Sequence, residues 1–150
     1  ALAIFRRLGA LLDIVAVYRD MTQLFLAQGD CSRAEEMARL RQHQARFLGH
    51  SDLILLALLD LAECEARSGR LEESRADYAS ALRQVQKEGD GIPSSILHQI
   101  SEKAIGFLEK GAGLADGANQ ARLLRERLLK GDYQGLLEEL PRELECGRTG

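Results

Sequence analysis

The stretch that decides the fold is RSGRLEESRADYASAL, residues 67–82, in which Gly69 separates two segments with a helical pattern. The stretch AQGDCSRAEEMA, residues 27–38, has the same layout around Gly29. The two glycines lie 40 residues apart, and a repeat period in this range is typical of stacked helical hairpins. Because one hairpin cannot bury its apolar face alone, the pattern predicts an array of packed helices.

Apolar residues recur at three- and four-residue steps through most of the chain, and no segment has the alternation of a strand. We therefore expect an all-α fold of six or seven antiparallel helices. The predicted single array covers residues 1–140, with hairpins over about 10–48 and 51–88 and less regular helices over 94–140. Residues 141–150 lack apolar periodicity and are predicted to be a frayed tail.

Local signals set the expected ends of individual helices. Gly9 is placed to divide the helical pattern of residues 2–28, and Ser32 with Glu35 has the spacing of a capping box. The segment Gly111-Ala-Gly113 is read as a loop between helices, and Pro141 is expected to end a short last helix.

Composition excludes several classes of protein. The formal net charge of the 150 residues is −3, which argues against a general nucleic-acid binder because such proteins carry excess positive charge. Three widely spaced cysteines without a CxxC motif are neither a disulfide framework nor a zinc site. They favour a reducing compartment, so we expect an intracellular protein, cytoplasmic or nuclear.

Membrane insertion is not expected, because the longest nearly apolar run, residues 53–59, is far too short to span a bilayer. The chain has no starting Met and no signal-peptide pattern, and its first residues already have a helical pattern. We therefore expect it to be a piece of a longer protein.

Residues 55–88 resemble a tetratricopeptide repeat, the family of paired antiparallel helices with small residues where the helices cross. The matching positions are Leu58, Leu61, Ala62, Gly69, Leu71, Ser74, Tyr78 and Ala81. Residues 15–48 match less well, since Ala38 and Arg41 depart from the pattern. Glu65 and Gln86 are departures within the better match. The resemblance implies a right-handed α-solenoid of the variant with longer helices.

In that family, the first helix of each repeat lines a concave groove that holds an extended peptide or a helix. Carried over by position, the groove would present seven side chains: Arg19, Gln23, Leu26, Leu56, Leu59, Glu63 and Arg67. The Lys/Asn set that clamps a C-terminal carboxylate in chaperone-type members is missing, since Asp60 and Glu63 occupy that region. A mixed apolar and charged groove is better suited to an internal peptide or an amphipathic helix.

The residues with catalytic or ligating chemistry do not form a recognisable site. His43, His50 and His98 lack metal-ligand spacing. Asp60 and Glu63 share a helix face, but no nucleophile or base accompanies them. Cys64 lies in the most apolar segment and is expected to be a buried, inert thiol. We therefore expect no metal, no cofactor, no small-molecule substrate and no enzymatic activity.

The sequence thus predicts a non-enzymatic scaffold or adaptor that binds a protein or peptide. The alternative is a regulatory or structural helical segment of a larger enzyme or transcription activator, docked on its own chain. An exposed apolar patch on the flank would favour that alternative, because a cut repeat array exposes an interface. The basic residues Arg39, His43 and Arg46 on one helix side are read as a solvated face. The oligomeric state is left open.

Overall fold

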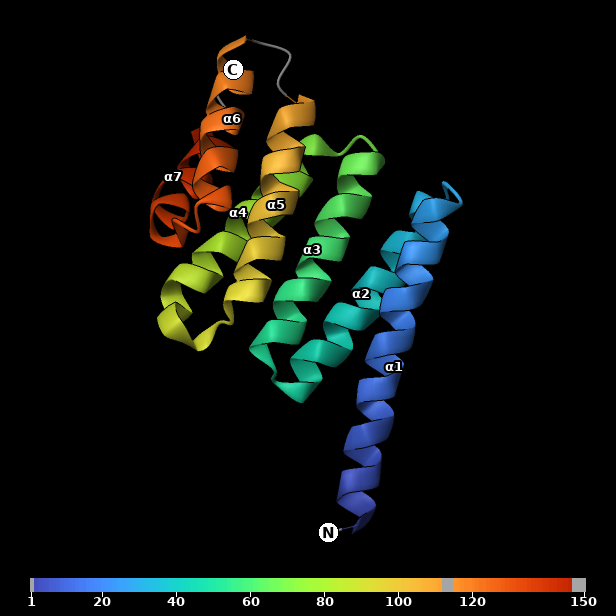
Figure 1. Cartoon of the computed structure of the whole chain (residues 1–150). Helices are drawn as coiled ribbons and strands as arrows, with labels where there is room; N and C mark the ends of the chain where they lie inside the picture. The colour runs from blue at the N-terminus through green and yellow to red at the C-terminus, as the bar shows by residue number, and fades with distance from the viewer. Residues whose placement is uncertain (1, 112–114, 147–150) are drawn as a thin grey trace. The chain divides into compact units, whose positions relative to one another are not determined.

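The computed structural model describes residues 2–111 and 115–146, and within them it contains seven α-helices and no strand (Figure 1). The helices are α1 (Leu2–Ala27), α2 (Cys31–Leu48), α3 (Ser51–Arg67), α4 (Leu71–Glu88), α5 (Ser94–Gly111), α6 (Ala115–Leu129) and α7 (Tyr133–Cys146), with a short 3-10 turn, η1 (Gly89–Gly91), after α4. The all-α prediction is confirmed. No helix in the described ranges is both long and apolar enough to cross a membrane.

Two of the predicted helix boundaries are wrong for identifiable reasons. Gly9 lies inside α1, because a glycine without a positive φ weakens a helix but does not end it. Asp30, not Ser32, caps α2: the Asp30 carboxylate accepts a hydrogen bond from the Arg33 backbone N–H at 3.1 Å. A carboxylate at the N-cap also interacts favourably with the positive end of the helix dipole.

A third prediction is wrong at the C-terminal end, where α7 continues past Pro141 to Cys146. Proline lacks an N–H, so the carbonyl of Leu137 four residues earlier loses its helical donor. The side-chain amide of Gln86 on α4 donates to that carbonyl instead. Residues 141–146 are therefore helical and not a frayed tail, while the tail predicted for 147–150 and most of the loop predicted at 111–113 lie outside the described residues.

The chain divides into two compact units, Ala1–Gly69 with α1 to α3 and Arg70–Gly150 with α4 to α7. The boundary falls at Gly69, which has a φ of +85°. Positive φ is nearly free for glycine and strained for other residues, so the sequence places a glycine at the turn. Gly29 has a φ of +79° at the turn between α1 and α2 for the same reason.

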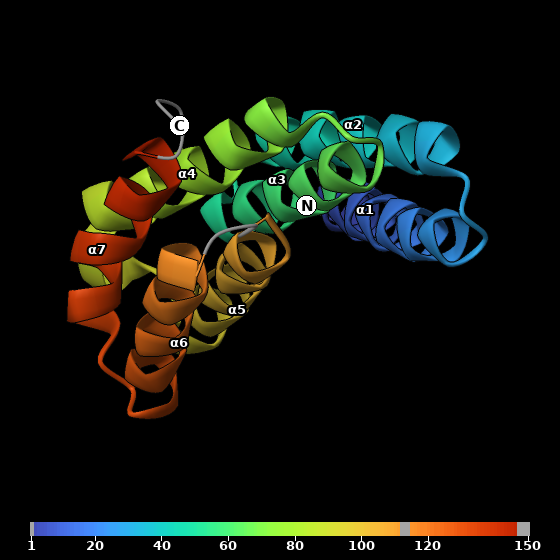
Figure 2. The ribbon, with the colours of Figure 1, turned by 90° about the horizontal axis from the view of Figure 1, so that it is seen from above.

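In the first unit, α2 packs against both α1 and α3 (Figure 2). Its buried face carries small side chains, Ala34, Ala38 and Ala45, at four- and seven-residue spacing. Small residues let neighbouring helices approach closely. Ala34 and Ala38 form one cluster with Leu26 from α1 and with Leu61 and Cys64 from α3. This cluster joins all three helices of the unit.

In the second unit, α4 packs against α5 and α7. Tyr78 on α4 contacts Phe107 on α5, with ring centroids 5.4 Å apart. The guanidinium of Arg83 donates to both carboxylate oxygens of Glu145 on α7, at 3.0 and 2.9 Å. Together with Gln86, this fork fixes α7 along α4.

Candidate partner-binding surface

Two hydrogen bonds hold α1 beside α3 and bring the predicted groove residues of the two helices together. The side-chain amide of Gln23 donates to Asp60 Oδ1 at 3.4 Å. Arg67 Nη1 donates to the backbone carbonyl of Leu26 at 3.2 Å. Asp60 and Arg67 lie about two turns apart on α3, whereas Gln23 and Leu26 lie about one turn apart on α1.

Five of the seven predicted groove residues retain access to solvent. Arg19, Gln23 and Arg67 are exposed, and Leu56 and Glu63 are half-buried. We call these five residues the α1–α3 surface. Leu26 and Leu59 are only 4% and 2% exposed, so they belong to the core instead of lining a groove. The position of a residue in the repeat pattern did not distinguish the solvent-exposed side of each helix from its buried side.

The charged side chains of the α1–α3 surface pair locally. Arg67 forms an i,i+4 ion pair with Glu63 at 3.1 Å, and Arg19 lies 3.3 Å from the carboxylate of Asp20. Exposed pairs of this kind contribute only about 0.2–1 kcal/mol each. A partner that offers a carboxylate can therefore take over either arginine at little free-energy cost.

A buried ion pair lies behind this surface and was not predicted from the sequence. Arg41 on α2 donates through Nη1 to Asp60 Oδ2, and the two residues are 3% and 6% exposed. Asp60 also accepts from Gln23, so one carboxylate connects all three helices of the unit. Two sequence features could have indicated this pair. Asp60 is a charged residue in the most apolar helix, and Arg41 stands where the repeat pattern has a small residue.

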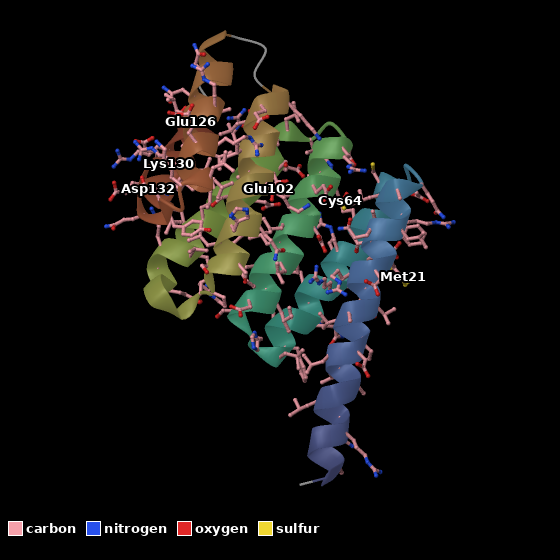
Figure 3. The ribbon with its side chains drawn as sticks, in the orientation of Figure 1. Met21, Cys64, Glu102, Glu126, Lys130 and Asp132 are labelled. Atoms are coloured by element: carbon pink, nitrogen blue, oxygen red, sulfur yellow. The ribbon has the colours of Figure 1, made fainter. Side chains whose placement is uncertain are left out.

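The thiol of Cys64 is fully buried on α3 (Figure 3). Burial, followed by the negative charges of Asp60, Glu63 and Glu35, raises the pKa of Cys64 to about 12. A thiol in this state is almost fully protonated near neutral pH and is a poor nucleophile. The expectation of a buried, inert cysteine agrees with this environment.

In the described part of the second unit, His98, Glu102 and Tyr133 form a small cluster of polar and aromatic groups. His98 Nδ1 lies 3.3 Å from the hydroxyl of Tyr133, and His98 Nε2 lies 3.9 Å from Glu102 on the same helix. The rings of His98 and Tyr133 meet edge to face, with their centroids 6.4 Å apart. Across the described residues, no three His, Cys, Asp or Glu side chains gather as a metal site would require.

Comparison with models of protein families, with curated proteins and with solved structures found no match to this chain.

Proposed function

We propose that this chain is a non-enzymatic, tetratricopeptide-like helical array that binds an extended peptide or a helix of a protein partner inside the cell. The binding site is the α1–α3 surface. The proposal also keeps the stacked right-handed arrangement and the single array over residues 1–140 that the sequence predicts.

One observation carries the proposal: two hydrogen bonds join α1 to α3, and the two helices expose charged groups of both signs beside a half-buried leucine. Arg19 and Arg67 offer two guanidinium groups from different helices, and Glu63, which pairs with Arg67, offers a carboxylate. Arginine forks bind carboxylates with defined geometry. This arrangement favours a partner segment that carries acidic side chains flanking an apolar residue, which would contact Leu56.

The test is binding of the purified chain to a peptide library, with a charge-reversed variant carrying Arg19→Glu, Glu63→Lys and Arg67→Glu. Arg19 and Arg67 are exposed and Glu63 is half-buried, and because Arg67→Glu also removes the bond to the Leu26 carbonyl, circular dichroism at 222 nm checks that the variant folds. A matched control reverses the same numbers of charges on the exposed side of α2, using Arg39→Glu, Glu36→Lys and Arg46→Glu.

Acidic peptides that bind the parent chain and the α2 control but lose affinity for the first variant would support the proposal. Reversal of two arginine contacts should weaken binding by about tenfold or more. If every selected peptide binds all three proteins alike, the α1–α3 surface is not the site. If selection enriches no acidic peptide, the stated partner chemistry is wrong.

A second candidate function is favoured by a different observation. Leu8 and Leu12, one turn apart on the same side of α1, are 43% and 49% exposed, and an exposed apolar patch is typical of a segment that packs on more protein. In that case the chain is a regulatory or structural segment docked on the rest of its own polypeptide. If the unmutated chain binds no peptide from the library under any condition, this candidate is favoured.

A further inference from the structure

One side of α1 carries an apolar stripe whose residues are exposed, apart from the half-buried Met21. Its members are Ala10, Ile14, Val17, Met21 and Leu24, which we call the α1 seam. Ile14, Val17 and Leu24 are 40%, 52% and 55% exposed. Figure 3 shows Met21 on the side of α1 turned away from α3. The packed side of the same helix is occupied by other residues, including the buried Val15 and Thr22.

The spacing of the seam identifies the kind of surface that fits it. Its residues follow one another at steps of four, three, four and three, which is the heptad pattern of a two-stranded coiled coil. Ile14 and Met21 take the a positions, and Val17 and Leu24 take the d positions. A long, narrow seam of this kind accepts one helix as its partner and leaves the opposite face free for α2 and α3.

We propose that the partner is the α1 seam of a second copy of this chain, paired antiparallel. In that register Ala10 of one copy faces Met21 of the other, so a small side chain meets a long one. Ile14 faces Val17 at the two central layers. A parallel pairing would instead set two alanines against each other in one layer and two methionines in another, which leaves a gap and a crowded layer.

The position of Arg7 also favours the antiparallel pairing with a second copy. Arg7 is exposed at the a position before the seam. In a parallel dimer the two Arg7 side chains would meet in one layer and repel each other. In the antiparallel dimer each Arg7 lies beside Leu24 of the other copy, near the C-terminal end of its α1. The last turn of α1 has no basic residue of its own, so a cation from the second copy is favourable there.

The first experiment is sedimentation equilibrium of the 150-residue chain over a range of concentrations. We expect a reversible monomer–dimer equilibrium. Val17→Glu places a charge in the central layers and should raise the dimer Kd by about tenfold or more. The matched control is Phe47→Glu on α2, which changes an apolar residue that is 75% exposed and should leave the Kd unchanged. A parent chain that stays monomeric, or a Val17→Glu dimer as tight as the parent, would overturn the proposal.

A variant that gains affinity excludes misfolding as the explanation. Asp13 and Asp20 lie along one edge of the seam, and antiparallel pairing places Asp13 near Asp20 of the second copy. Arg19 already offsets the charge of Asp20. Asp13→Lys should convert two repulsive approaches into two attractive ones and lower the Kd by roughly threefold or more. An unchanged or higher Kd for this variant would contradict the antiparallel register.

Cysteine cross-linking reads the orientation directly. In a background with Cys31→Ser and Cys146→Ser, the chain carries Ala10→Cys and Met21→Cys together and is oxidised as a dimer. The remaining cysteine, Cys64, is buried. Peptide mass spectrometry should find a link between positions 10 and 21 of different copies. Links between identical positions would show a parallel dimer and overturn the proposal.

Discussion

The buried pair of Arg41 and Asp60 gives the sharpest test of how the first unit is held together. We expect Arg41→Met to destabilise that unit far more than the loss of an ordinary surface charge would. Methionine keeps the apolar length of the side chain but removes the guanidinium. The Asp60 carboxylate, 6% exposed, then loses this guanidinium in the interior and keeps the 3.4 Å hydrogen bond from Gln23.

The magnitude follows from this burial. Breaking a buried pair from one side costs about 3–5 kcal/mol, and because Gln23 still donates to the carboxylate we expect about 3–4 kcal/mol for Arg41→Met. Asp60→Asn keeps the shape and leaves a buried guanidinium without its charged acceptor, which costs about 2–3 kcal/mol. The double variant removes both charges and should cost less than the sum, so the coupling free energy is about 2–3 kcal/mol.

The assay is urea denaturation followed at 222 nm for the parent, the two single variants and the double variant. A parallel cycle on Arg39 and Glu35 is the control, since this i,i+4 pair lies on the same helix with an exposed arginine. Its coupling should stay below about 0.5 kcal/mol. A coupling free energy under about 1 kcal/mol for Arg41 and Asp60 would lie in the range of surface pairs. It would refute the reasoning that burial makes the loss of one partner of this pair costly.

Three further predictions concern stability. Gly69→Val should cost about 1–3 kcal/mol in thermal or urea melts, because φ is +85° there although the space around the added Cβ is open; unchanged melting would contradict it. Gln86→Ala should cost about 1–2 kcal/mol by removing the donor to the Leu137 carbonyl, and less in a Pro141→Ala background, where a backbone N–H is restored; equal costs in both backgrounds would contradict it. Because the pKa of Cys64 is raised from 9.0 to about 12, the folded chain keeps a proton that the unfolded chain loses. Stability is therefore full below pH 9 and falls as pH rises toward 12, by up to about 1.4 kcal/mol per pH unit. Cys64→Ala should flatten this fall between urea melts at about pH 8 and about pH 10.5, and an identical slope would contradict it.

The helices could be predicted because their signals are local. Gly29 and Gly69 mark turns by a backbone conformation that other residues adopt only with strain. The hairpin bounds predicted at residues 48, 51 and 88 coincide with the observed end of α2, start of α3 and end of α4. Ser74, Tyr78 and Ala81 on α4, which match the small and aromatic positions of the repeat that the sequence resembles, are buried. None of these features depends on knowing which distant segment is the neighbour.

The candidate site was only partly predictable, since it depends on which flank of each helix is covered. Arg19, Gln23 and Arg67 are exposed, whereas Leu26 and Leu59 are in the core. The repeat pattern predicts which side of the hairpin a residue lies on. It does not predict how many residues around the helix the neighbouring helices cover. This coverage is set by the small residues of the neighbouring helix, which let the three helices of the unit approach closely.

Two of the misses share one physical cause, which is that a residue unsuited to its local position is compensated from a distant one. Arg41 stands where a small side chain was expected, and its charge is matched by Asp60, 19 residues away. Pro141 leaves a carbonyl without its helical donor, and Gln86 on another helix replaces that donor. Both exceptions to the local pattern therefore mark tertiary contacts. Arg41 and Gln86, two of the four departures from the repeat pattern, form contacts that periodicity alone cannot predict.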